Sequence, residues 1–148
     1  MGINRHCLPD GLGWHIVQGA DVGNWVADRI DGSYFAEQSS AIGLQKDAKT
    51  IAGVIYENWN RRTVFCHIAV EGRLTKSYLK AIFDYPFNVL NVEKIIVPVV
   101  TDNQKSIKLV QNMGFVEEAR IKDGSPLGDI IFMTLAKENC RFLGVRYG

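Results

Sequence analysis

Between Arg61 and Phe115 the chain reads RRTVFCHIAVEGRLTKSYLKAIFDYPFNVLNVEKIIVPVVTDNQKSIKLVQNMGF. Two apolar runs, Thr63 to Val70 and Ile95 to Val100, flank a run with helical spacing that begins near Thr75. This pattern predicts a strand, a crossover helix and a second strand, which together form a parallel pair with a right-handed connection. Such a unit places a helix N-terminus beside the strand ends, where anions bind readily.

The composition predicts a single domain over residues 1–148, with residues 1–13 as a loosely ordered lead-in. The chain is 47% hydrophobic and 22% charged, which is typical of a globular protein with a sizeable core. A net charge of +1 argues against a general nucleic-acid surface, which needs a concentrated basic patch. No apolar run approaches the ~20 residues of a membrane-spanning helix. We therefore expect no general nucleic-acid binding and no membrane partner, although a small local basic patch is compatible with the composition.

The cysteines argue for a reduced, cytoplasmic protein. Cys7, Cys66 and Cys140 are scattered and odd in number, and no pair has metal-like spacing. His6 beside Cys7 is weak support for a metal, so we expect none. The N-terminus also lacks the basic and apolar regions of a signal peptide.

The remaining elements are predicted from periodicity and turn residues. We expect strands at 14–17, 40–45, 50–59, 116–122 and 129–135, and a helix at 21–30 with Asp21 as its N-cap. Residues 33–38 could form a second short helix. The last helix is predicted to begin at an Asp102 cap and to end at Gly114.

Two prolines mark interruptions. Pro86 should end or kink the preceding helix near Tyr85, because it removes a backbone donor. Pro98 lies inside an apolar strand, where a central strand cannot normally lose a donor. Either the neighbouring strand diverges there and opens a gap in the sheet, or the strand has a simple bulge.

The order of elements resembles the GCN5-related N-acetyltransferase (GNAT) superfamily from about Trp14 to Leu135. The residues that carry the resemblance are Asn103, Ser106 and the helix end Met113-Gly114-Phe115. Glu118-Ala119-Arg120 and Asp129 are similar to the branch that acetylates protein N-termini and other amines, and the short form resembles small phage-encoded members. The resemblance implies an α/β (α+β) fold: a mixed, mostly antiparallel sheet with a central splayed parallel pair and helices on both faces.

The resemblance also implies acetyl-CoA as cosubstrate, bound in the splay between the strands at 63–70 and 95–100. Its pantetheine arm would follow the backbone of Ile68, Ala69 and Val70, and Asn103 and Ser106 would contact it from the last helix. The pyrophosphate would meet the loop and first helical turn formed by Gly72, Arg73, Leu74, Thr75 and Lys76. This loop departs from the family pattern, since it has one glycine and begins with the acidic Glu71, which Arg73 and Lys76 could offset.

The implied reaction is direct transfer of the acetyl group to a primary amine. Such an amine is mostly protonated near neutral pH, so a general base is required. Glu57 and His67 are both candidates, and the sequence does not choose between them. Trp59 is either a residue of the acceptor pocket or an aromatic that packs over the hairpin.

Two further residues bear on the mechanism. Many family members carry a tyrosine at the position of Val110 to protonate the departing thiolate, so Tyr78, Ser106 or water would have to replace it here. Cys66 could suggest an acyl-enzyme, but we interpret it as a buried core thiol.

A second class of function is a catalytically degenerate protein that uses the same fold to bind a protein partner, with or without CoA. The altered loop and Val110 favour it, whereas Asn103, Glu57 and His67 favour the enzyme. The amine acceptor is not encoded in any motif. The final strands could pair across a homodimer, as they often do in the family.

Overall fold

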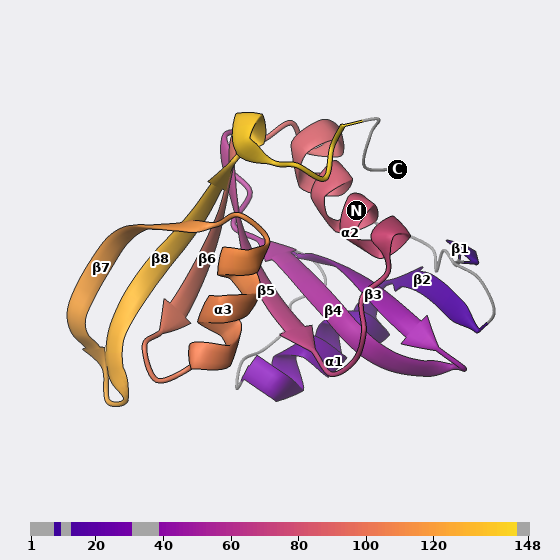
Figure 1. Ribbon diagram of the computed structural model, residues 1–148, viewed down its shortest axis with the longest axis horizontal. Coiled ribbons are helices and arrows are strands. Elements are labelled where there is room, and N and C mark those ends of the chain that lie inside the picture. Colours follow the sequence, from indigo (N-terminus) through magenta and orange to yellow (C-terminus); the bar gives the residue numbers. More distant parts are fainter. Residues whose placement is uncertain (1–7, 10–12, 31–38, 145–148) are drawn as a thin grey trace.

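The computed structural model describes residues 8–9, 13–30 and 39–144 (Figure 1). Most of the predicted lead-in and the possible helix at 33–38 lie outside these residues. The elements, in order, are β1 Leu8–Pro9, β2 Trp14–Gln18, α1 Ala20–Ile30, β3 Ser40–Lys46, β4 Lys49–Glu57, β5 Thr63–Val70, α2 Lys76–Asp84, a π-helical turn Tyr85–Val89, β6 Lys94–Val100, α3 Gln104–Asn112, β7 Val116–Ser125, β8 Gly128–Ala136 and a 3-10 turn Lys137–Asn139.

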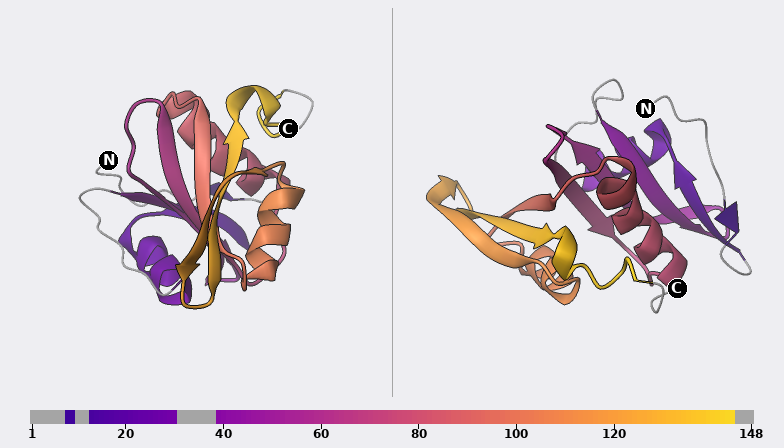
Figure 2. Two further views of the ribbon diagram at one scale, coloured as in Figure 1. Left: turned by 90° about the vertical axis from the view of Figure 1, so that its left-hand side faces the viewer. Right: turned by 90° about the horizontal axis from the view of Figure 1, so that it is seen from above.

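The described strands form one sheet in the order β1-β2-β3-β4-β5-β6-β8-β7. Its pairs are antiparallel except for β5 and β6, which run parallel. Figure 2 shows α1 on one side of the sheet and α2 and α3 on the other. The predicted mixed sheet with helices on both faces is therefore confirmed.

Two glycines let α1 lie close to the sheet. Gly43 on β3 and Gly53 on β4 are directly opposite each other. A Cβ on Gly43 would lie 2.8 Å from a methyl of Val22, and one on Gly53 would lie 2.6 Å from a methyl of Val26. Larger side chains at these two positions would push the helix away from the strands.

The predicted behaviour of α2 is confirmed at both ends. Thr75 is its N-cap, and the Thr75 hydroxyl accepts a hydrogen bond of 3.1 Å from the Tyr78 N–H. The α-helix stops at Asp84, and a π-helical turn with Pro86 near its start follows. The missing proline donor explains why the regular helix ends there.

Two other predicted caps are wrong. The helix α1 begins at Ala20, because the Gly19 carbonyl already accepts from the N–H groups of Val22 and Gly23, so Asp21 lies within the first turn. The cap of α3 is Asn103, whose side chain accepts from the Ser106 N–H at 3.1 Å, and not its neighbour Asp102.

The two parallel strands separate where Pro98 predicts that they should. Their pairing runs from Thr63↔Lys94 to Phe65↔Ile96 and then stops. On its other side β6 stays paired with β8 through Val100 without a register shift, so the strand has no bulge there. Figure 1 shows β5 and β6 diverging beyond this point, with α3 beside the gap.

None of the described helices is long and apolar enough to cross a membrane. The described part of the chain also contains no group of three or more His, Cys, Asp or Glu side chains that could hold a metal ion.

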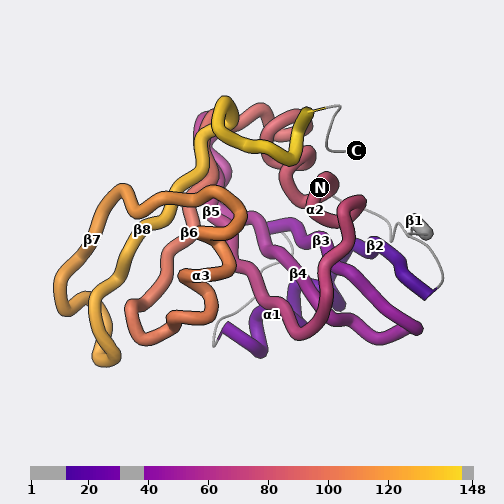
Figure 3. Tube along the Cα trace, in the orientation of Figure 1, coloured from indigo at the N-terminus to yellow at the C-terminus, as the bar shows by residue number. Residues whose placement is uncertain are grey.

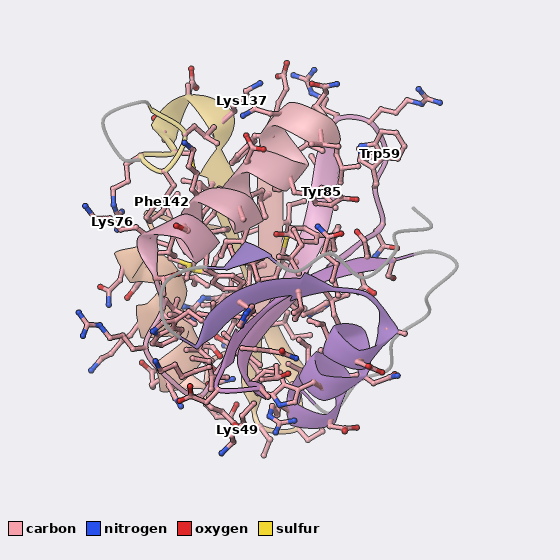
Figure 4. All side chains as sticks on the ribbon, turned by 90° about the vertical axis from the view of Figure 1, so that its right-hand side faces the viewer. Lys49, Trp59, Lys76, Tyr85, Lys137 and Phe142 are labelled. Carbon is pink, nitrogen blue, oxygen red and sulfur yellow. The ribbon has the colours of Figure 1, made fainter. Side chains whose placement is uncertain are left out.

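The described segment after β8, residues 137–144, packs against α2. Figure 3 shows it passing from the end of β8 across to α2, and Figure 4 shows Phe142 beside that helix. Phe142 is buried and stacks on Phe83 of α2, with ring centroids 4.7 Å apart. Phe142, which follows β8, is therefore part of the core.

Replacing this ring should destabilise the fold. We expect Phe142→Ala to lower the free energy of unfolding by about 3–5 kcal/mol, because a buried aromatic leaves a cavity. Urea denaturation followed by circular dichroism measures the change. Val89→Ala is the control, since Val89 is 59% exposed and should change stability by less than ~0.5 kcal/mol. Equal midpoints for the two variants would contradict the assignment.

Candidate active site

The divergence of β5 and β6 opens a cleft of about 980 Å³. Its walls are the last residues of β4 and α1, the second halves of β5 and β6, and one side of α3 along most of its length. The lining residues are Arg29, Ile30, Glu57, His67, Ile68, Ala69, Val70, Glu71, Val97, Pro98, Val99, Val100, Asp102, Asn103, Lys105, Ser106, Lys108, Leu109, Val110 and Asn112.

One wall of the cleft is an unpaired strand edge. β4 pairs with β5 as far as Val70, but β6 pairs with β5 only as far as Phe65. Among the described residues, no strand therefore pairs with the β6-facing edge from His67 to Val70. Backbone donors and acceptors need partners when water is excluded. An extended ligand with amide groups of its own, such as pantetheine, would supply them to Ile68, Ala69 and Val70.

Glu57 and His67, the two candidate bases, form one unit. The His67 Nε2 lies 2.6 Å from the Glu57 Oε1. Because Ile55 is opposite His67 and Glu57 is opposite Phe65, the two side chains share one face as diagonal neighbours. The side chains are 23% and 27% exposed, so both reach the cleft while remaining largely shielded from water.

This contact fixes where the imidazole proton lies. An ionised carboxylate can only accept, so the hydrogen between the two side chains belongs to Nε2 of His67. In the neutral ring the lone pair is then on Nδ1. His67 can accept a proton at Nδ1 while Glu57 orients the ring, as the carboxylate does in a Ser-His-Asp triad.

Asn103 and Ser106 form part of the α3 wall. The Asn103 Oδ1 accepts from the Ser106 N–H, so the cap uses the carbonyl end of the amide. The Nδ2 end makes no hydrogen bond to another described residue. The Asn103 amide donors and the Ser106 hydroxyl are thus uncharged groups available to a ligand at the start of α3.

The expected phosphate loop contributes less than the family pattern implies. Glu71 lines the cleft, but Gly72, Arg73, Leu74, Thr75 and Lys76 are not among the lining residues. The carboxylate of Glu71 is paired with Arg29, whose Nε lies 2.8 Å from Oε2. Arg29 is held in turn by Trp25, over whose ring it lies at 3.8 Å. The negative charge of Glu71, which should repel phosphates, is therefore offset by the positive charge of Arg29 on α1.

Sequence reasoning missed the cations of the cleft. Arg29 gave no signal, because its partner lies 42 positions away in the chain. Lys105, Lys108 and Asn112 do carry a sequence signal. Their spacing of three and then four residues places them on one face of α3. That polar face could have been assigned to a cleft wall.

Besides residues 72–76, three other residues named from the sequence lie outside the cleft lining. Trp59 is 47% exposed, and its Nε1 donates to the Leu90 carbonyl at 3.1 Å; Figure 4 shows it at the rim of the molecule. Tyr78 is buried, and its hydroxyl donates to the Ile42 carbonyl at 2.9 Å, so it is not placed to protonate a thiolate in the cleft. Cys66 is a buried core thiol, as interpreted.

Several solved N-acetyltransferases share this fold. A mutant of spermidine N-acetyltransferase SpeG from Vibrio cholerae is 16% identical with a TM-score of 0.67, covering 89% of this chain and 97% of that chain. A probable acetyltransferase is 15% identical with a TM-score of 0.61, covering 84% and 94%. Ribosomal-protein-S5-alanine acetyltransferase from Vibrio fischeri is 18% identical with a TM-score of 0.58, covering 71% and 65%.

The sequence itself matches no protein-family model and no curated protein. The likeness is therefore one of structure. The chain has the GNAT fold that its sequence predicts.

Alkylation of Cys66 tests whether its thiol is buried and outside the cleft, as the structure has it. Burial raises the pKa of the Cys66 thiol, so the group stays protonated as well as inaccessible. Iodoacetamide should therefore alkylate Cys66 only after unfolding, as followed by peptide mass spectrometry with and without denaturant. Rapid alkylation of Cys66 in the native protein would contradict its burial and would support an acyl-enzyme mechanism.

Proposed function

We propose that the protein transfers the acetyl group of acetyl-CoA directly to a primary amine. The observation that carries this proposal is the Glu57–His67 pair, which lies in the cleft between the diverging strands of a GNAT fold. Two of the structural neighbours support an amine acceptor, since they are a spermidine N-acetyltransferase and a ribosomal-protein-S5-alanine acetyltransferase.

The residues present fit acetyl-CoA in two respects. The unpaired edge of β5 at Ile68–Val70 offers the backbone groups that amides of a pantetheine arm would need. Arg29, Lys105 and Lys108 supply cations to the cleft in place of a glycine-rich loop. We assign phosphate binding to these cations.

The proposed chemistry forms a C–N bond and breaks the thioester C–S bond. His67 takes a proton from the acceptor ammonium at Nδ1, and Glu57 stabilises the imidazolium that results. The freed amine then attacks the thioester carbonyl carbon. As the C–S bond breaks, the nitrogen loses its second proton, which reaches the departing thiolate through the Ser106 hydroxyl or a water. Backbone N–H groups near Ile68 and Ala69 would polarise the carbonyl oxygen.

The departing thiolate needs a proton that Val110 cannot give. Val110 is buried in the cleft wall and carries no hydroxyl. Ser106 lines the same wall, so its hydroxyl or a water beside it is the remaining source. A thiol has a reference pKa of about 8.5, so leaving it ionised near pH 7 costs only ~2 kcal/mol. The absence of tyrosine therefore slows the reaction without preventing it.

A non-catalytic binding protein remains the second candidate, favoured by Val110 and by the absence of residues 72–76 from the cleft lining. Calorimetric titration with acetyl-CoA and desulfo-CoA, followed by CoA release with a panel of amines, separates the two. Micromolar binding, about −8 kcal/mol, with turnover supports the enzyme. Binding without turnover on any amine supports the second candidate.

The base assignment predicts an order of effects. His67→Ala should lower kcat by about 10²–10⁴-fold with the dissociation constant of acetyl-CoA unchanged, because it removes the proton acceptor. Glu57→Gln should lower kcat by a smaller factor, since Glu57 acts through the ring. Steady-state kinetics measures both, with Glu93→Gln as a control outside the cleft. The reverse order would assign the base to Glu57, and wild-type rates in both would remove the pair from the mechanism.

The Arg29–Glu71 pair predicts opposite shifts in cofactor affinity. Glu71→Gln should tighten acetyl-CoA binding about two- to fivefold and Arg29→Gln should weaken it by a similar factor, since partly exposed charges are worth at most ~1 kcal/mol. Titration at low and high salt tests this, because screening should reduce both shifts. Shifts of the same sign in both variants would show that the pair acts only through local structure.

A further inference from the structure

A pair of hydrogen bonds joins the β7–β8 hairpin to the residue that leads into α3. The Thr101 N–H donates to the Asp129 carbonyl at 2.9 Å, and the Asp129 N–H donates to the Thr101 hydroxyl at 3.0 Å. Thr101 and Asp129 continue the β6–β8 ladder by one position beyond Val100↔Ile130. Neither residue lines the cleft.

Gly128 makes room for this link. Its φ of +144° belongs to the region that favours glycine. A Cβ there would lie 2.3 Å from the Thr101 Oγ1, well inside van der Waals contact. The close approach of hydroxyl and hairpin therefore depends on a residue without a side chain.

The hairpin side of the link is held firmly. The Asp129 Oδ1 accepts from the Asp123 N–H at 2.9 Å, and Oδ2 accepts from Arg120 at 2.8 Å. Arg120 also donates to Glu117 across the same strand. The Asp123 N–H and the Arg120 guanidinium hold the pKa of the Asp129 carboxyl below its usual value, so these bonds persist at neutral pH.

The other side of the link leads directly to the cleft. The Thr101 carbonyl accepts from the Gln104 side chain at 2.6 Å, which ties it to the first residue of α3. Asn103 follows two positions after Thr101, caps the helix and lines the cleft. Any shift of Thr101 relative to β8 would move Asn103 and Ser106 with it.

We propose that Thr101 is a positioning residue, which uses its hydroxyl to anchor the N-terminus of α3 to the hairpin and so sets the cleft wall that receives acetyl-CoA. This inference rests on the proposed function. Groups that bind a ligand must be held within a fraction of an ångström, so a loosened wall should cost cofactor affinity and leave the Glu57–His67 pair intact.

Thr101→Val and Thr101→Ser form the matched test, because only serine keeps the hydroxyl. Thr101→Val should raise the dissociation constant and KM for acetyl-CoA about tenfold, with kcat at saturation and KM for the amine within twofold of wild type. Thr101→Ser should restore wild-type values. Glu118→Gln is the control, since it removes a carboxylate from the same hairpin whose partners are Lys94 and Thr134 and not Arg120 or Asp129. Equal affinities in the valine and serine variants would overturn the proposal.

Amide hydrogen exchange supplies a readout that needs no ligand. The Ser106 N–H is protected by the Asn103 cap, so it should exchange faster in Thr101→Val than in wild type or Thr101→Ser. If the wild-type protein binds no acetyl-CoA, the proposed function is wrong, and the exchange comparison alone decides whether the hydroxyl anchors α3. Unchanged exchange at Ser106 in Thr101→Val would overturn the anchoring itself.

Discussion

The site depends on the point at which β5 and β6 stop pairing. Pro98 has no N–H to give to a neighbouring strand, and the parallel ladder ends at Ile96, two residues before it. Each strand keeps its outer partner, β4 for β5 and β8 for β6, so the sheet remains continuous on both sides of the gap. The unsatisfied backbone is thus confined to the two edges that face the cleft, where a ligand rather than a strand can complete it.

The Glu57–His67 and Arg29–Glu71 contacts differ in what they can contribute. Glu57 and His67 are about three-quarters shielded and 2.6 Å apart, so their geometry is fixed and a proton can be placed at a definite atom. Arg29 and Glu71 are 33% and 47% exposed, and water screens their charges. The first pair suits chemistry, whereas the second adjusts the local charge near the strand end and has a modest energetic effect.

The sequence predicts well what local patterns encode and poorly what depends on distant contacts. Apolar runs and one proline were enough to place β5, β6 and their divergence. Arg29 could not be found, because its role follows from how α1 lies across the sheet. Trp59 lies only two residues after Glu57 but outside the cleft lining, because Asn58 has a φ of +56° and the chain turns away after β4. The candidate site residues on β4, on β5 and at the start of α3 line the cleft, whereas residues 72–76 do not.

The wrong cap at α3 is informative about the site. Aspartate and asparagine are about equally good N-caps, so the sequence Asp102-Asn103 leaves the choice open. The structure uses asparagine, whose carbonyl caps the helix and whose amide remains available to the cleft. An aspartate in the same place would cap as well but would present an acceptor and a negative charge to the ligand. Capping by Asn103 therefore satisfies the helix end and leaves a hydrogen-bond donor on a residue that lines the cleft.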